Sequence, residues 1–277
     1  MARPLLRLLR LRDTSIFDQL RLEEALLRAD PGASNWLILN RGADPGLAVL
    51  GASGKPRELL NVRAMLDDGI PAVKRFSGGG TVFVDSGTLF ATIIMNNVDA
   101  PPRPYPRDIM DWSAEVYREA LARGSGVRSF HLRDNDYTVG DGDDGEGLKF
   151  GGNAQSIVRD RWLHHTSFLW EFDPDTMHRY LQMPKKMPDY RGDREHRSFL
   201  RPMHEFIDTP DTFFDSLVDE LGTRYDVEET DVEAAWEAVE GLDHRRSNKV
   251  RGRCGGGAGE VRGRCEDVSG GRGLEVW

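Results

Sequence analysis

The segment Lys74-Arg-Phe-Ser-Gly-Gly-Gly-Thr-Val-Phe-Val-Asp85 sets three successive glycines between two stretches of strand-forming residues. Glycine has no Cβ, so the backbone here can take positive φ and approach a ligand closely. Exposed N–H groups in such a turn suit phosphate or carboxylate, and Arg75 offers a fork of donors for phosphate. The segment is neither a GxGxxG fingerprint nor a P-loop, because no Gly-Lys-Ser/Thr follows. Considered alone, a tight hairpin with a surface arginine explains these residues equally well.

A single lysine precedes a glycine pair and two amide side chains in Leu148-Lys-Phe-Gly-Gly-Asn-Ala-Gln155. A lysine held among polar groups can hold a carboxylate beside a phosphate and neutralise charge at an α-phosphoryl centre. Lys149 is therefore a candidate catalytic residue. Taken alone, a solvated lysine at the start of a strand is the simpler interpretation.

Two further polar stretches lie before and after this lysine. In Trp162-Leu-His-His-Thr-Ser-Phe-Leu-Trp170 the adjacent histidines of a strand point to opposite faces, so they cannot easily bind one metal ion. No other spacing of histidine, cysteine or carboxylate residues indicates a metal site. Arg133-Asp-Asn-Asp-Tyr137 can orient Lys149 or position Mg²⁺, or it can form an ordinary turn at a strand end.

Hydrophobic periodicity and turn residues predict strands and helices around these segments. The first expected helix begins at Thr14 or Ser15 and runs to Arg28, and others cover residues 61–66, 108–121, 175–181, 210–225 and 232–239. The expected strands cover residues 36–39, 47–50, 81–84, 89–94, 127–132, 136–139, 149–158 and 162–170. Turns are expected at 41–46 and at Asp85-Ser-Gly87, a proline-rich loop at 99–106 and an acidic hairpin loop at 140–147.

The N-terminal residues 1–12 are basic and apolar, and they fit either an organelle-targeting segment or a first strand. We favour the strand, because the first helix follows without a spacer. Cytoplasm and mitochondrion stay open as locations, and plastid is not excluded.

Bulk composition argues against several classes of protein. The 277 residues suffice for one large domain, and a formal charge of −9 argues against nucleic-acid or membrane partners. No stretch approaches the roughly 20 apolar residues that span a bilayer. Both cysteines, Cys254 and Cys265, lie near the C-terminus, so the preceding chain has no thiol. From His244 onward the sequence is rich in glycine and arginine, and we expect a disordered tail at 244–277 after a folded domain at 1–243.

Taken together and in order, these segments resemble the lipoate–protein ligase A family. The matching residues are Arg75 with Ser77-Gly-Gly-Gly-Thr-Val82, Asn135-Asp136, Lys149-Phe-Gly-Gly-Asn-Ala-Gln155 and His164-His165-Thr166. The layout is most similar to plant-type members, as in Pro104-Tyr-Pro-Arg-Asp-Ile-Met110 and Phe168-Leu-Trp170. The resemblance covers residues 5–225, and the ordered set of motifs is more specific than any one motif.

The resemblance implies an α+β fold, with a mixed β-sheet core and flanking helices. This is the catalytic domain of biotin and lipoate ligases, which is related to class II aminoacyl-tRNA synthetases. The implied reaction joins lipoate and ATP, with Mg²⁺ bridging the phosphates, to give lipoyl-AMP and pyrophosphate. The lipoyl group then passes to a lysine on lipoyl domains of 2-oxoacid dehydrogenase E2 subunits or on the glycine-cleavage H protein.

Expected site residues follow from the same resemblance. Lys149 matches the lysine that contacts both the lipoate carboxyl group and the adenylate. Arg75 and the backbone of Gly80-Thr-Val-Phe83 match the nucleotide-binding stretch, and Ser77 and His165 match pocket positions. The residues expected to bind nucleotide or substrate are Arg75, Ser77, Gly78, Gly79, Gly80, Thr81, Val82, Phe83, Lys149, Asn153 and His165, with no metal ligand among them.

Two departures from the family pattern leave alternatives open. Many members have His-Asp after the glycine strand, where this chain has Val84-Asp85. Bacterial members often carry a further C-terminal domain, so transfer is expected either to need an accessory ligase subunit or to run in a one-domain form. The alternative functions are an octanoyltransferase with an acyl-cysteine intermediate, a biotin ligase, and a non-catalytic protein that binds a lipoyl domain. The preference between lipoate and octanoate also stays open.

Overall fold

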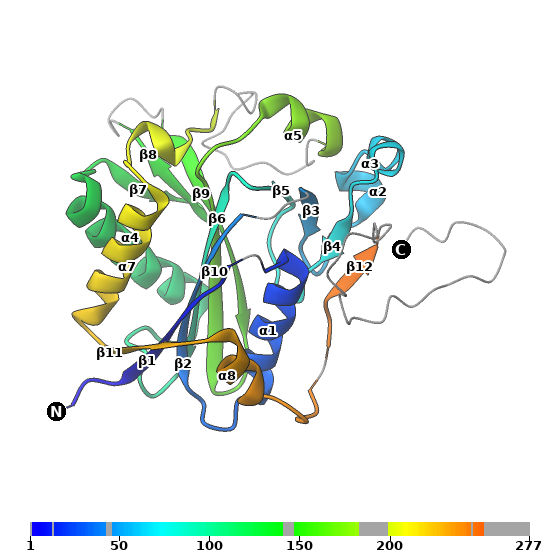
Figure 1. The fold of residues 1–277 in the computed structure, drawn as a ribbon. Coiled ribbons are helices and arrows are strands. Elements are labelled where there is room, and N and C mark those ends of the chain that lie inside the picture. The colour runs from blue at the N-terminus through cyan, green and yellow to red at the C-terminus, as the bar shows by residue number, and fades with distance from the viewer. Residues whose placement is uncertain are drawn as a thin grey trace.

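A computed structural model describes residues 2–12, 14–42, 46–140, 147–182, 199–244 and 246–251. Its centre is an eight-stranded sheet, and a four-stranded sheet lies to one side (Figure 1). The large sheet contains, in spatial order, β11 (Asp226–Thr230), β1 (Leu5–Arg10), β2 (Asn35–Arg41), β6 (Thr88–Asn96), β10 (Arg161–Leu169), β9 (Leu148–Ile157), β8 (Asp136–Val139) and β7 (Phe130–Arg133). The small sheet contains β12 (Lys249–Arg251), β4 (Ala72–Lys74), β3 (Leu47–Leu50) and β5 (Val82–Val84).

The large sheet is mixed, with parallel pairing at one edge. Strand β1 pairs in parallel with both β11 and β2, and the other neighbouring pairs are antiparallel. The helices are α1 (Ile16–Ala29), α2 (Pro56–Leu59), α3 (Val62–Asp68), α4 (Pro106–Ser125), α5 (Pro174–Tyr180), α7 (Pro210–Gly222), α8 (Val232–Glu237) and the 3₁₀ turn η2 (Met203–Glu205). Helices α4 and α7 cover one face of the large sheet and α1 covers the other (Figure 1).

The central strands of the large sheet are apolar on both faces because both faces are covered. Along β6, Leu89, Ala91 and Ile93 pack in the core with α4 and α7. Phe90 and Ile94 alternate with them and pack in the core with α1. This two-residue period places residues at successive positions of β9 and β10 on opposite sides of the sheet, so one strand can serve both a core and a site.

Most of the expected elements are confirmed. Residues 5–10 form the strand that we favoured over a targeting segment, and Ser15 caps α1 by accepting a hydrogen bond from the Asp18 N–H. The mixed sheet with flanking helices confirms the expected α+β class. In the described part of the chain, no helix combines the length and the apolar character that crossing a membrane requires.

Two expected turns join strands that do not pair with each other. Asp85-Ser-Gly87 follows β5 of the small sheet and leads into β6 of the large sheet. Residues 41–46 likewise connect β2 of the large sheet to β3 of the small sheet. A turn sequence specifies a change of direction but not the partner of the next strand, so the two-sheet arrangement was not predictable from these residues.

The largest differences from the expected boundaries concern helix α4 and the C-terminal segment. Helix α4 begins at Pro106 and continues to Ser125, because proline suits the first helical turn and Gly126 ends the helix in the left-handed conformation. Residues 249–251, which we expected to be disordered, form β12 and pair antiparallel with β4. The structured domain therefore continues past the expected boundary at residue 243, and the expectation for residues 252–277 lies outside the described residues.

Candidate functional site

A cavity of about 1070 Å³ opens where α1, the small sheet and strands β9 and β10 of the large sheet meet. Most of the residues predicted from the sequence line it, namely Gly78–Val82, Arg75, Lys149, Asn153 and His165. These residues come from three strands and one loop, so the fold brings the separate sequence motifs to one place.

Two predicted residues have side chains away from the cavity wall. Ser77 is buried, with 1% of its surface exposed. Phe83 packs in the core on the other face of the small sheet, where its ring stacks on Tyr180 with 5.3 Å between centroids. Its neighbours Val82 and Val84 line the cavity, as the alternation of a strand requires. Any contact from Phe83 to a ligand would thus involve its backbone.

The glycine loop, residues 78–80, is exposed at the cavity. Gly79 has φ +98°, and a Cβ there would lie 2.8 Å from Nη2 of Arg75 and 3.3 Å from Cβ of Ala154. A residue with a side chain would therefore be strained in its backbone and would also collide with the guanidinium. Because Ala154 belongs to β9, the glycine loop lies close to the strand that carries Lys149.

The guanidinium of Arg75 donates hydrogen bonds to the glycine loop and to its neighbours. Its Nε donates to Ser77 Oγ at 3.1 Å, Nη2 donates to the carbonyl oxygens of Gly78 at 2.8 Å and Gly80 at 3.0 Å, and Nη1 donates to the Val49 carbonyl at 3.5 Å. Burial lowers the pKa of Arg75 to about 10, and the nearby Glu23 carboxylate opposes that shift. The guanidinium is thus a buried cation at the cavity wall that fixes the shape of the glycine loop, and the contact with phosphate expected from the sequence stays a prediction.

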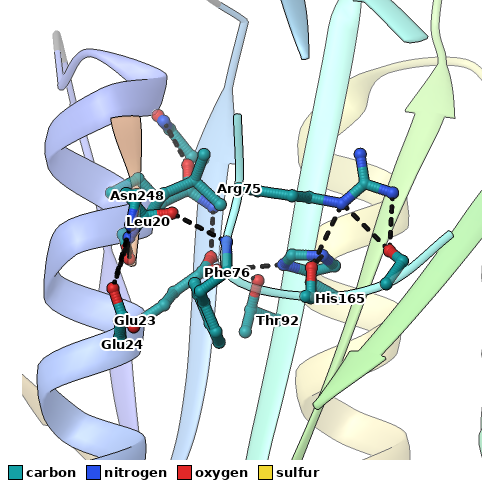
Figure 2. Close-up of polar contacts among 12 residues, drawn as sticks. Leu20, Glu23, Glu24, Arg75, Phe76, Thr92, His165 and Asn248 are labelled. Atoms are coloured by element: carbon teal, nitrogen blue, oxygen red, sulfur yellow. Dashed lines mark hydrogen bonds and ion pairs between the residues drawn. The ribbon is translucent and has the colours of Figure 1, made fainter. Parts of the chain in front are cut away.

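A chain of polar contacts continues from Arg75 to helix α1 (Figure 2). Ser77 Oγ lies 2.9 Å from Nε2 of His165, and Nδ1 of His165 lies 3.0 Å from Oε2 of Glu23. Glu23 is completely buried and also accepts a 2.6 Å hydrogen bond from Thr92 Oγ1. Although serine, histidine and glutamate stand in the order of a nucleophile relay, Ser77 Oγ is buried and accepts a hydrogen bond from Arg75. The chain therefore holds the glycine loop to the sheet and to α1.

Glu23 is a cavity-lining residue that the sequence did not single out as part of the site. It lies on the helix face that carries Ile16, Leu20 and Leu27, and it lines the cavity. A carboxylate on a buried helix face must be hydrogen-bonded, because an unpaired buried charge is very costly. The helical spacing alone indicates this requirement for a partner, whereas the identity of the partner, His165, depends on the tertiary structure.

Lys149 is held at the cavity wall by a carboxylate. Its Nζ lies 2.8 Å from Oδ1 of Asp136, and 23% of the lysine side chain is exposed. Gly152 makes room for this arrangement, since a Cβ there would lie 3.3 Å from Nζ of Lys149. The Lys149 carbonyl accepts a 2.9 Å hydrogen bond from the N–H of Arg201. The segment Arg133–Tyr137, which fitted either a turn or a support for Lys149, thus supplies the carboxylate that orients this lysine.

Asn153 is positioned by a second polar network. Its Oδ1 accepts a 2.7 Å hydrogen bond from Thr166 Oγ1, and its Nδ2 donates to the Asn135 carbonyl at 3.0 Å. Behind these residues, Nδ1 of the buried His164 accepts a 3.1 Å hydrogen bond from Nε2 of Gln155. The proton of neutral His164 therefore lies on Nε2, which is 3.3 Å from Thr166 Oγ1.

The buried His164 makes stability depend on pH. Burial, with a smaller contribution from His165, lowers the pKa of His164 from 6.5 to about 3. Between these values the unfolded chain binds a proton that the folded chain does not, so stability falls as the pH falls. From pH 6.5 to pH 5 this group alone should cost about 2 kcal/mol of unfolding free energy.

We expect urea unfolding at pH 7 and pH 5 to show a smaller loss of stability in the His164→Gln variant than in the parent chain. The other titrating groups are common to both proteins, so the difference between the two losses isolates this histidine. Equal losses in the two proteins would contradict a buried neutral His164.

Among the residues that the structure describes, no group of three or more histidine, cysteine or carboxylate side chains is arranged to hold a metal ion. Asp136 is the carboxylate beside Lys149, and Asp134 also lines the cavity. If Mg²⁺ enters with a nucleotide, phosphate oxygens would therefore have to supply much of its coordination, which is usual for this ion.

Comparisons with known proteins agree with this geometry. The sequence model of the lipoyl protein ligase A/B catalytic domain matches residues 15–222. A relative from Plasmodium falciparum (isolate 3D7), inactive lipoate–protein ligase 2, is 28% identical over 251 residues, and the match covers 73% of this chain and 65% of that protein. The chain thus spans just under two thirds of that relative.

Two solved structures share the fold. A bipartite lipoate protein ligase from Thermoplasma acidophilum, described with its E2 lipoyl domain, gives a TM-score of 0.65 at 20% identity, over 86% of this chain and 91% of that one. A lipoate–protein ligase A bound with ATP gives a TM-score of 0.66 at 20% identity, over 86% of this chain and 92% of that one. The expected biotin/lipoate ligase catalytic fold is therefore confirmed.

Proposed function

This chain belongs to the lipoyl protein ligase A/B catalytic-domain family, and we propose that it is an ATP-dependent lipoate–protein ligase. The observation that carries the proposal is the meeting of the glycine loop and Lys149 at one cavity, with the loop packed against β9 at Ala154. An exposed backbone loop suits phosphates, and a fixed ammonium beside it suits a reaction that builds up negative charge.

In the proposed first step, a carboxylate oxygen of lipoate attacks the α-phosphorus of ATP. The bond from that phosphorus to the oxygen bridging the β-phosphate breaks, and pyrophosphate leaves with the electron pair. The product is lipoyl-AMP, a mixed anhydride. Two anions must approach each other in this step, so the ammonium of Lys149 lowers the barrier by neutralising charge at the α-phosphoryl oxygens. The ion pair with Asp136, in which the ammonium donates to the carboxylate, fixes Lys149 before substrate arrives.

The apolar part of the cavity supports an acyl substrate. Ile16, Leu20, Val49, Val84 and Phe90 line it, and burying an aliphatic chain there would gain about 25 cal/mol for each Å² removed from water. Lipoate and a close octanoyl-type acid share this chain and the reacting carboxylate. We therefore propose this class of acid as the substrate.

In the proposed second step, the ε-amine of an acceptor lysine attacks the acyl carbon of lipoyl-AMP. An amide forms, AMP leaves, and the amine proton passes to solvent. Lipoyl domains are the proposed acceptors, because the Thermoplasma acidophilum ligase is described with its E2 lipoyl domain. We propose the glycine-cleavage H protein as a further acceptor. The Thermoplasma acidophilum ligase is bipartite, which supports a role for an accessory subunit in this protein as well.

A ligase fold without ligase activity is the second candidate function. It is favoured by the name of the Plasmodium falciparum relative, inactive lipoate–protein ligase 2. It is also favoured by Val84, which lines the cavity where many family members have histidine. The paired Lys149 and Asp136 in this chain support the active alternative. An octanoyltransferase with an acyl-cysteine has less support, because residues 1–253 contain no cysteine.

A mass-shift experiment tests the proposed function. The purified chain is mixed with an apo lipoyl domain or apo H protein and lipoate, with and without ATP, and the acceptor is weighed by mass spectrometry. We expect the acceptor to gain a lipoyl group only when ATP is present. In a parallel reaction, an acyl thioester of a carrier protein replaces free lipoate; modification from this donor without ATP, with the carrier thiol as leaving group, would indicate a transferase. An unmodified acceptor with no pyrophosphate release would indicate the non-catalytic alternative.

A further inference from the structure

Residues 246–251 form a segment that joins helix α1 to the strand leading into the glycine loop. Its last residues are β12, which pairs with β4, and Lys249 lies opposite Lys74 in that pairing. Because Arg75 follows β4 directly, the segment reaches the start of the glycine loop. It also lies beyond residue 222, where the match to the family model ends.

On helix α1, Glu24 is the residue that accepts hydrogen bonds from this segment. Its carboxylate is buried, with 2% of the residue exposed. It accepts hydrogen bonds from the N–H of Ser247 at 2.9 Å and from Nδ2 of Asn248 at 2.9 Å, and it pairs with Nε of Arg28 at 3.2 Å. A buried carboxylate that accepts this many hydrogen bonds fixes its partners firmly.

Asn248 connects helix α1 to the backbone at Phe76. Its Nδ2 donates to Glu24 and also to the Leu20 carbonyl at 2.9 Å, while its Oδ1 accepts a 3.0 Å hydrogen bond from the N–H of Phe76 (Figure 2). Phe76 stands between Arg75 and Ser77, the two residues that hold the glycine loop in shape. One side chain from the C-terminal segment therefore ties α1 to the backbone of this loop.

We propose that Asn248 is a positioning residue for the nucleotide site, acting through the backbone of Phe76 on the glycine loop. Residues 246–251 thus act as a latch that completes the site from outside the family-matched region. The proposal rests on the proposed function only in assigning the glycine loop to ATP. The latch itself makes no contact with substrate in this account.

The latch is tested in the full chain, first without any ligand, by hydrogen–deuterium exchange. In Asn248→Ala the N–H of Phe76 loses its acceptor, so its exchange should become about tenfold faster, as expected for the loss of one hydrogen bond. The amides of β6 should keep their protection. Ser247→Ala is the matched control, because Ser247 donates to Glu24 through its backbone N–H, which alanine retains.

The same variants are then compared in ATP binding and in lipoate-dependent pyrophosphate release. For Asn248→Ala we expect the KM for ATP to rise about fivefold to tenfold with kcat within about twofold, because one net hydrogen bond is lost from the loop support. Glu24→Gln should shift the KM in the same direction.

Unchanged exchange at Phe76, or equal loss of protection in β6, would overturn the latch. If the parent chain neither binds ATP nor releases pyrophosphate, the proposed function fails while the exchange result still decides the latch.

Discussion

Replacing Lys149 with alanine is expected to reduce lipoyl-AMP formation by about 100- to 1000-fold, the range found when one preorganised charge-stabilising group is removed from an active site. The reason is specific to the first step. The ammonium beside Asp136 is the cation proposed to neutralise the developing charge at the α-phosphoryl group. The measurement is lipoate-dependent pyrophosphate release in the absence of any acceptor.

Two further variants separate chemistry from folding. Lys149→Arg keeps a positive charge beside Asp136 but replaces the slim ammonium, for which Gly152 leaves room, with a planar fork. We expect it to fold and still lose most of its activity. Lys55→Ala is the control lysine, because its side chain is 73% exposed and pairs only weakly with Glu58 at the surface. Pyrophosphate release by Lys149→Ala at the parent rate would remove this lysine from the mechanism.

Replacing Gly79 with alanine is expected to weaken ATP binding by about 10- to 100-fold, which corresponds to strain of about 1–3 kcal/mol in the loop. Gly79 has φ +98°, and the new Cβ would lie 2.8 Å from Nη2 of Arg75. The guanidinium would have to move, and it would then lose its hydrogen bonds to the carbonyl oxygens of Gly78 and Gly80. Calorimetric titration with ATP measures the effect.

Gly69→Ala is the matched control for backbone strain. Gly69 also has positive φ, at +70°, but a Cβ there would meet nothing within 4 Å. It ends α3, away from the cavity lining. We expect this variant to lower thermal stability and to leave ATP affinity unchanged. Equal weakening of ATP binding in both variants would show that general destabilisation, and not loop geometry, is responsible.

Local sequence was enough to predict the parts of the site that depend on local geometry. Three consecutive glycines predict a backbone that a ligand can approach, and the structure exposes them at the cavity. Lys149 beside a glycine pair was a weak indication alone and became a strong one only within the ordered set of motifs. The elements carrying both were predicted correctly, because strands and helices are set by periodicity.

What the sequence could not show is which groups pair across the fold. Arg75 looks like a phosphate ligand in sequence, yet it also donates to the Ser77 hydroxyl and to carbonyl oxygens that lie within reach only when the loop is formed. His165 meets Glu23, which lies 142 positions earlier, so no local pattern predicts the pair. These long-range pairs decide that Arg75 and Ser77 shape the loop, while Lys149 and the loop backbone face the cavity.

The C-terminal segment shows how composition can mislead. Glycine and arginine predict disorder after His244, and that argument is sound for a stretch that buries little apolar surface. Ser247 and Asn248 nevertheless donate hydrogen bonds to the buried carboxylate of Glu24, and residues 249–251 pair with β4. Two requirements of the rest of the fold order this segment. The buried carboxylate of Glu24 needs hydrogen-bond donors, and the edge strand β4 needs a pairing partner. Neither requirement is visible in the composition of the segment itself.

The central claim is that this chain activates lipoate as an adenylate, and isotope exchange tests it most directly. Labelled pyrophosphate is incubated with the purified chain, ATP and Mg²⁺, with no acceptor protein, and incorporation of label into ATP is followed with and without lipoate. Reversible formation of lipoyl-AMP predicts exchange that depends on lipoate and that is lost in Lys149→Ala. No exchange from a folded chain that binds both lipoate and ATP would contradict the account and leave the ligase fold as a binding protein.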